Sequence, residues 1–329
     1  MDFLKLREEF KTQSYDSIVL ATTSNHSSDF LRLPDKYING QKCMSFSIAN
    51  PTIATEVIQI FDGTAKYIYV DVERKQDIDF ITIAQENIKI SRLREMKPND
   101  LAMEAADILI YKTIKDKNSN VLIVGTGNIG IKLAIRLTER NYNVYLHGRN
   151  KEKVDNFVNM INQMLPKYSK KINAWDNEQI DVLCTMVSAV EVIDDSYIPY
   201  LKNGALAIDG GIGNFSKGFI KNAHLKDINV LRLDVRISND LLNGIDQSYN
   251  SNFFTDIKGE KDFNGIHIVS GGIIGKEGDV IVDRIHIPKR VIGIANGIGG
   301  VKPVDTISDL EKEQINIINE EIRKEADRK

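Results

Sequence analysis

Residues 120–150 read NVLIVGTGNIGIKLAIRLTERNYNVYLHGRN, and this stretch decides the fold. It opens with a short β-branched apolar run over 121–124, which is typical of a strand buried on both faces. The run leads into the glycine-rich segment 125–130, and a helical pattern follows over 129–140. A second apolar strand pattern starts at residue 143. We therefore predict a strand–loop–helix–strand unit of a parallel sheet.

The glycine-rich segment matches the spacing GxGxxG, and each glycine has a physical role. Gly125 allows a tight turn after the strand, Gly127 lets the backbone approach a pyrophosphate, and Gly130 lets the helix pack closely on the sheet. The free N–H groups at the helix start would face that diphosphate. A glycine-rich turn of another α/β fold is the structural alternative. The predicted dinucleotide-binding loop comprises Gly125, Thr126, Gly127, Asn128, Ile129 and Gly130.

The residues after the second strand indicate which dinucleotide binds. An acidic residue at this strand tip would favour NAD, but the sequence there is His-Gly-Arg-Asn-Lys-Glu-Lys over 147–153. Arg149 is suited to stack on adenine and to pair with a 2′-phosphate, while Asn150 and Lys153 add a donor and a positive charge. An ordinary basic helix start is the alternative interpretation. We predict NADP as the cofactor, with NAD as the second possibility.

Apolar runs alternate with helical patterns along most of the chain, which indicates an α/β protein: a Rossmann doubly wound parallel sheet plus a smaller N-terminal α/β domain. The predicted strands are 17–22, 44–48, 66–72, 121–124, 143–146, 182–187, 205–209 and 230–233. The predicted helices are 2–12, 51–61, 99–117, 129–140, 151–165 and 305–327.

Three segments follow from this pattern. Residues 1–115 are expected to form a substrate-binding and catalytic domain, 116–303 the dinucleotide-binding domain, and 304–329 a helix that packs on the first domain or on a partner subunit. We expect Asn99 or Asp100 to cap the connecting helix, and 276–278 to form a hairpin turn. A homodimer is expected.

Composition excludes several classes of function. The net charge of −3 gives no reason to expect binding to nucleic acid or to anionic membranes. The two cysteines and five histidines lack metal-ligand spacing, so no metal site is predicted. The N-terminus does not resemble a signal peptide, and no apolar run is long enough to span a bilayer. We expect a cytoplasmic protein.

Further cofactor contacts are expected at the ends of the later strands. Val187 and Ser188 follow the fourth strand and should lie near the nicotinamide ribose, because the cofactor crosses the carboxyl ends of the strands. Gly210 and Gly211 follow the next strand and would allow a ligand to approach the backbone. An ordinary turn is the alternative for these glycines.

The arrangement resembles the superfamily of two-domain dehydrogenases that includes shikimate, methylenetetrahydrofolate and amino-acid dehydrogenases. Residues 147–153 look like the Asn-Arg-Thr segment of shikimate dehydrogenases, which implies 2′-phosphate binding. The segments 206–213 and 299–303 are similar to the Ile-Asp-Val-Gly and Gly-Gly-Val-Gly-Pro stretches of the folate enzymes, with Lys302 as a departure. Asn99-Asp100 falls where the shikimate enzymes carry Asn-Thr-Asp-Gly, which implies a binding or proton-transfer role for Asp100.

Neither family's lysine motif is present, so the proton-transfer group must be sought among other residues. Lys75 and Asp100 are the catalytic candidates, beside Lys97, because hydride transfer at a C–O or C–N centre needs a group that moves a proton. Arg92 and Arg94 are candidates to bind an anion. The polar segment 22–29, with His26, is a candidate for substrate binding. For each of these residues a surface role is the alternative.

The sequence therefore predicts an NADP-dependent oxidoreductase that transfers a hydride to or from a small polar metabolite, such as a hydroxy or keto acid, an amino acid or a folate-like molecule. Two alternatives remain. One is an enzyme with tightly bound NAD(P) that performs hydrolase, lyase or cyclase chemistry, and the other is a cofactor-sensing protein without activity.

Overall fold

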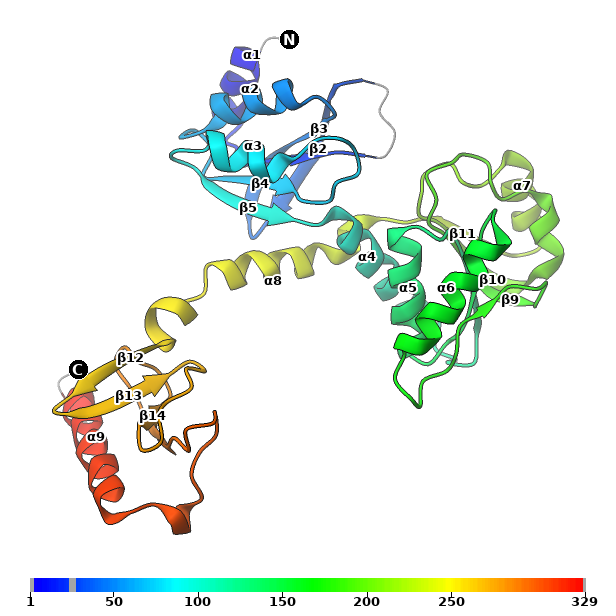
Figure 1. Ribbon diagram of the computed structural model, residues 1–329. Helices are drawn as coiled ribbons and strands as arrows, with labels where there is room; N and C mark the ends of the chain where they lie inside the picture. Colours follow the sequence, from blue (N-terminus) through cyan, green and yellow to red (C-terminus); the bar gives the residue numbers. More distant parts are fainter. Residues whose placement is uncertain (1–2, 24–27, 328–329) are drawn as a thin grey trace. The chain divides into compact units, whose positions relative to one another are not determined.

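The computed structural model describes residues 3–23 and 28–327, and it divides into two compact units, Met1–Asp246 and Gln247–Lys329 (Figure 1). The first unit contains two sheets with helices packed against them, and the second contains a small sheet and a long helix. The predicted α/β class is confirmed. Within the described residues, no helix is both long and apolar enough to cross a membrane.

The N-terminal sheet has the order β2-β3-β1-β4-β5. Its central strands β1 (Ser17–Ala21) and β4 (Tyr67–Asp71) are almost fully buried, which explains their continuous apolar sequence. The strands β3 (Gln41–Ile48) and β5 (Arg92–Met96) run parallel to them, and β2 (Phe30–Ile38) is an antiparallel edge. Strands β2 and β5 were not among those predicted from the sequence.

Three helices cover one face of this sheet: α1 (Phe3–Thr12), α2 (Pro51–Phe61) and α3 (Phe80–Asn87). Figure 1 shows them on the same side. Helix α2 starts where the sequence predicts because Pro51 opens it and the Asn50 side chain accepts hydrogen bonds from two amides of the first turn, at 2.9 and 3.3 Å.

The second sheet has the order β11-β10-β9-β6-β7-β8, with every strand parallel. This is the doubly wound Rossmann order, in which the order of the strands in the sheet reverses between β6 and β9. The strands are β6 (Asn120–Val124), β7 (Asn143–His147), β8 (Asn173–Ala174), β9 (Ile180–Thr185), β10 (Leu201–Asp209) and β11 (Asn229–Arg232). The helices α4 (Pro98–Thr113), α5 (Asn128–Glu139) and α6 (Lys151–Met164) pack on one face, and η1 (Asp195–Tyr200) and α7 (Lys217–Leu225) pack on the other.

The connecting helix α4 is capped from another part of the chain. It begins at Pro98, and its N-cap residue Lys97 makes no capping hydrogen bond through its side chain. The amide of Asn99 instead donates to Oε2 of Glu73, at 2.6 Å. The expected cap by Asn99 or Asp100 is therefore wrong, because a carboxylate from the loop after β4 takes this role.

Three ion pairs join α4 to α5. Their partners are Asp100 with Lys132, Glu104 with Arg136, and Asp107 with Arg140. The acids and the bases recur at a spacing of three or four residues on their helices, so each set lies on one face. The Asp107 carboxylate is fully buried and receives two hydrogen bonds from Arg140, at 2.5 and 2.7 Å.

Helix α8 (Asn239–Tyr249) follows β11 in the sequence and packs against the N-terminal sheet. Its Leu242 is buried in a cluster with residues of that sheet. The buried Asp246 carboxylate accepts a hydrogen bond from the Tyr69 hydroxyl at 2.8 Å and lies 3.6 Å from Nε of Arg94. Helix α8 thus makes a return to the first domain within the first unit; that the final helix packs on the first domain or on a partner subunit stays a prediction.

The second unit has its own mixed sheet, β12-β13-β14-β15. Strands β12 (Gly259–Phe263) and β13 (Ile266–Ser270) form an antiparallel pair, while β13 and β14 (Val280–Val282) pair in parallel. Strand β15 (Val291–Ile294) completes the sheet. The expected hairpin at 276–278 is wrong, since the chain crosses over between two parallel strands there.

Helix α9 (Asp309–Asp327) packs on this small sheet through the buried Ile318. Lys302, the departure in the glycine-rich loop, pairs with Glu277 and Glu311, both at 2.9 Å, and so fastens the loop to the helix.

The structure divides the chain after residue 246. From the sequence we expected 116–303 to form one domain and 304–329 to lie apart from it. Residues 247–303 supply strands to a different core.

The buried pair of Asp107 and Arg140 should contribute far more stability than the exposed pair of Asp100 and Lys132. We expect Arg140→Ala to lower the free energy of unfolding by about 3 kcal/mol, because the Asp107 carboxylate stays buried without a partner. Lys132→Ala should cost about 0.5 kcal/mol, because its ion pair is half-exposed. Urea denaturation measures both, and equal losses would contradict this account of the ion pairs.

Candidate dinucleotide and substrate site

The glycines of the loop after β6 have different structural requirements. Gly125 has φ of +128°, and a Cβ there would lie 2.6 Å from the carbonyl oxygen of Met186. A Cβ on Gly130 would lie 2.2 Å from the carbonyl oxygen of Gly125, so α5 can approach the strand end only without a side chain. Gly127 has an ordinary φ of −87°, and a Cβ there would meet nothing within 4 Å. Its lack of a side chain is not required by the packing of the described residues.

The free N–H groups at the start of α5 lie beside the open space at Gly127. Its N-cap residue is Gly127, which has no side chain to bond the first-turn N–H groups. A cavity of about 480 Å³ lies there, at the carboxyl ends of β6, β7 and β9. Among its lining residues are seven of the predicted contacts: Gly125, Thr126, Gly127, Arg149, Lys153, Val187 and Ser188. This is the place where a doubly wound sheet binds a dinucleotide.

The tip of β7 carries no acid at this cavity. His147 lines it with its ring edge-on to Trp175 and Tyr197, and burial lowers the pKa of His147, which favours the neutral imidazole. Arg149 is exposed, and it makes no hydrogen bond or ion pair with the described residues. Asn150 is the N-cap of α6 and accepts a hydrogen bond from the amide of Lys153 at 2.9 Å.

The loops after β9 and β10 are packed tightly together. A Cβ on Gly210 would lie 2.5 Å from the carbonyl oxygen of Thr185, and one on Gly211 would lie 1.9 Å from that of Val187. The buried Asn214 amide donates to the carbonyl oxygens of Val187 and Ala189, at 3.1 and 2.7 Å. These two glycines therefore serve loop packing, although both also line a second cavity.

The second cavity, of about 470 Å³, lies between the two sheets of the first unit. It adjoins the cofactor cavity, since Val187 and Ser188 line both. The other residues that line it come from both lobes: Ala21, Thr22, Thr23, Leu33, Lys36, Lys75, Met96, Pro98, Asn99, Ile129, Met186, Gly210, Gly211 and Ile212. Ile212 has φ of +66°, a strained conformation for a β-branched residue and one that is commonly found at functional sites.

Lys75, a predicted catalytic candidate, does line this cavity. Its ammonium lies 2.7 Å from the buried Asp71 carboxylate and 3.2 Å from Glu73. Asp71 also accepts hydrogen bonds from the amides of Thr22 and Glu73, at 3.4 and 2.9 Å. The Lys75 side chain is therefore held in place at the end of β4, next to the start of α4.

Lys36 also lines this cavity, and the sequence analysis did not find it. A bulge in β2 puts it there: Leu33 pairs with Ser45 and Lys36 with Cys43, so β2 has one residue more than β3 between these pairs. In a regular strand, residues three apart point to opposite faces, but here both Leu33 and Lys36 line the cavity. Burial lowers the pKa of the Lys36 ammonium.

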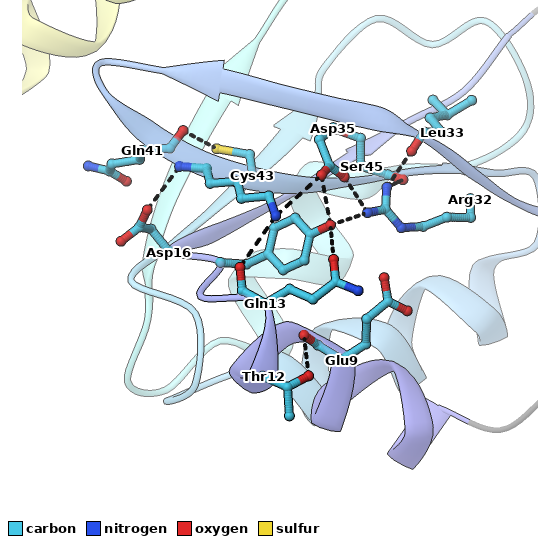
Figure 2. Close-up of polar contacts among 12 residues, drawn as sticks. Glu9, Thr12, Gln13, Asp16, Arg32, Leu33, Asp35, Gln41, Cys43 and Ser45 are labelled. Carbon is cyan, nitrogen blue, oxygen red and sulfur yellow. Dashed lines mark hydrogen bonds and ion pairs between the residues drawn. The ribbon is translucent and has the colours of Figure 1, made fainter.

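Figure 2 shows the polar contacts that hold this bulge. Arg32 forms an ion pair with Asp35, and the two residues bracket the bulged segment. Asp35 accepts a hydrogen bond from the Tyr15 hydroxyl at 2.7 Å, and Arg32 donates to that hydroxyl at 3.0 Å. The ammonium of Lys42 lies 4.1 Å from the centre of the Tyr15 ring. The edge strand is thereby fastened to the turn between α1 and β1.

Other first-lobe candidates lie elsewhere. Asp100 is paired with Lys132 and contacts two hollows beside α4, not the cavity of Lys75. Lys97 borders one of these hollows. Arg94 lies over the Tyr67 ring and beside Asp246, in a structural contact. His26 and its neighbours at 24–27 lie outside the described residues, while Thr22 and Thr23 do line the cavity.

Comparison with known proteins agrees with this geometry. A family model described as the NAD binding domain of 6-phosphogluconate dehydrogenase matches residues 120–239, from β6 to the start of α8. The second lobe thus matches an NAD-binding domain, in agreement with the dinucleotide-binding loop predicted from the sequence. The fold and the site thereby define a protein with an NAD-binding domain built on a doubly wound parallel sheet. No curated protein matches the chain.

Several solved structures match the chain distantly. A shikimate dehydrogenase in complex with NADP+ is 13% identical over 71% of this chain and 96% of its own, with a TM-score of 0.43. L-tryptophan dehydrogenase from Nostoc punctiforme is 11% identical over 72% and 74% of the two chains, with a TM-score of 0.42. The A chain of dipicolinate synthase from Bacillus subtilis is 12% identical over 71% and 77%, with a TM-score of 0.37.

Alanine substitutions at two glycines should separate folding from binding. We expect Gly130→Ala to lower the free energy of unfolding by about 3 kcal/mol, because its Cβ would meet a backbone oxygen that cannot move aside. Gly127→Ala should cost no more than about 1 kcal/mol, as expected for an N-cap without a side-chain hydrogen bond. It should still weaken dinucleotide binding at least about tenfold, by blocking the approach of the pyrophosphate.

Urea denaturation and calorimetric titration with NADP and NAD measure the two effects. Wild-type affinity in Gly127→Ala would contradict the placement of the pyrophosphate at this helix start.

Proposed function

We propose that this chain is an NADP-dependent oxidoreductase that transfers a hydride between the nicotinamide and a small polar metabolite bound between its two lobes. The observation that carries the proposal is the open space at Gly127, which is bounded by the uncapped start of α5 and adjoins the second cavity at Val187 and Ser188. A dinucleotide lying across these strand ends would direct its nicotinamide toward that cavity.

The preference for NADP is supported by charge at the tip of β7. Arg149 and Lys153 line the cofactor cavity, and no acidic residue is among those lining it. A ribose 2′-hydroxyl would find no carboxylate there, whereas a 2′-phosphate would find a guanidinium that makes no ion pair with the described residues. Asn150 fixes the start of α6 through its side-chain oxygen, which accepts a hydrogen bond from the amide of Lys153, and its side-chain NH2 is left as the proposed donor to a 2′-phosphate.

When bound, the dinucleotide would supply hydride-transfer chemistry at a carbonyl or imine carbon, or at the corresponding alcohol or amine carbon in the reverse direction. The protein supplies position and a proton. Lys75 is the proposed proton-transfer residue, because its ammonium lines the substrate cavity and is oriented by Asp71 and Glu73. Asp100 is not proposed for this step, since its carboxylate is paired with Lys132 away from this cavity.

The cofactor preference can be tested at a single residue. Arg149→Ala should weaken NADP binding about tenfold or more, because one charged contact to phosphate is lost. The same change should alter NAD binding by less than about twofold, and Lys151→Ala, at an exposed helix position outside the cavity, is the matched control. Equal losses for both dinucleotides in isothermal titration would overturn the 2′-phosphate assignment.

The proton-transfer assignment can be tested by kinetics. We expect a screen of small carbonyl compounds, followed by the absorbance of the reduced nicotinamide, to find a substrate whose kcat falls about 100-fold or more in Lys75→Met. NADPH affinity should be unchanged, because Lys75 does not line the cofactor cavity. Circular dichroism checks that the variant folds, and an unchanged kcat in a folded variant would exclude Lys75 from proton transfer.

A further inference from the structure

Two lysines line the second cavity, which is the proposed substrate site, and they differ in whether a carboxylate lies beside the ammonium. The ammonium of Lys75 is neutralised by Asp71 and Glu73. Lys36 lines the same cavity but makes no hydrogen bond or ion pair with any described residue. Burial has the largest effect on the pKa of Lys36 and lowers it. The charge of Lys75 lowers it further, whereas Cys43 and Asp71 act in the opposite direction without cancelling the shift.

The nearby carboxylates are already engaged. Asp71 receives the Lys75 ammonium and two backbone amides, and Glu73 receives the same ammonium and the first amide of α4. From β3, the group facing Lys36 is the fully buried thiol of Cys43, and burial raises its pKa to about 12. A neutral thiol provides no counter-charge. The cavity therefore holds one positive charge without a counter-ion among the described residues.

A partly buried ammonium without a counter-ion is unfavourable, and a bound anion would remove this cost. The remaining wall of the cavity is mostly apolar, with Leu33, Met96, Ile129, Met186 and Ile212 among its residues. A phosphate or sulfate would need several charged donors, but a single carboxylate next to an apolar body matches one lysine and this lining.

We propose that Lys36 binds the carboxylate of the substrate, so that the substrates of this site are small carboxylic acids with an apolar body. The inference rests on the proposed hydride-transfer function, because it assigns the substrate of that same cavity. The acid would lie with its carboxylate at the bulge of β2 and its carbonyl or amine carbon toward Val187 and Ser188, where Lys75 is available to transfer the proton. Its apolar chain would contact Leu33 and Met96.

The test uses the full chain saturated with NADPH and titrated with 4-methylpentanoate, which has no keto group to accept a hydride, with its amide and with methyl phosphate, followed by cofactor fluorescence. We expect the acid to bind at least about tenfold more tightly than the amide, which lacks the charge. Lys36→Met should remove this difference, Lys36→Arg should retain most of it, and Lys112→Met, an exposed lysine of α4, should behave as wild type.

The affinity should also depend on pH in a defined direction. The carboxylate needs a protonated Lys36, whose pKa is lowered by burial, so affinity should fall as pH rises through that pKa. In Lys36→Arg this loss should vanish, because a guanidinium stays charged. A structural role for Lys36 would produce no such difference between lysine and arginine.

The outcomes separate this inference from the proposed function. If wild type does not bind NADPH, the proposed function fails. If NADPH binds but the acid and its amide bind equally, if methyl phosphate binds more tightly, or if Lys36→Met keeps the preference, then the carboxylate assignment is overturned. With any substrate found, Lys36→Met should raise KM at least about tenfold and change kcat little, whereas a fall in kcat alone would also overturn it.

Discussion

The close contact between α5 and the end of β6 is the constraint on which the rest of the first unit depends. Gly130 packs directly against the carbonyl oxygen of Gly125. Because this contact orients α5, the free N–H groups of its first turn face the cavity at the carboxyl ends of the parallel strands. The same contact fixes the helix face that carries Lys132, Arg136 and Arg140. The connecting helix α4 then has only one register in which its three acids meet these bases.

Through α4, this contact also determines where the N-terminal sheet meets the cofactor lobe. Glu73 accepts a hydrogen bond from the start of α4 and also contacts Lys75. The helix that joins the lobes is therefore linked directly to the end of β4. Helix α8 makes a second connection through Asp246 and Tyr69. The cavity between the sheets is therefore bounded by elements tied to each other by buried hydrogen bonds, which favours a preformed site.

The sequence predicted those features that depend on neighbouring residues. The β6–α5–β7 unit follows from the glycine spacing, and α2 follows from Asn50 and Pro51, since both act within a few residues. Strand β2 was missed because it is an edge with Pro34 and alternating charges, and its place comes from pairing with β3. The ion pairs of α4 had a visible signal in the regular spacing of acids and bases, which gives Asp100 a structural explanation.

The assignment of Lys36 depends on a feature that no single strand encodes. A regular β2 would send Leu33 and Lys36 to opposite faces, and only the extra residue opposite β3 brings both to one cavity. The ion pair of Arg32 with Asp35 and the Tyr15 hydroxyl hold the bulge from the outside, where their charges remain partly solvated. The polar cluster at the edge of the sheet thus holds the bulge that places Lys36 in the wall of the second cavity, where it pairs with no charged group among the described residues.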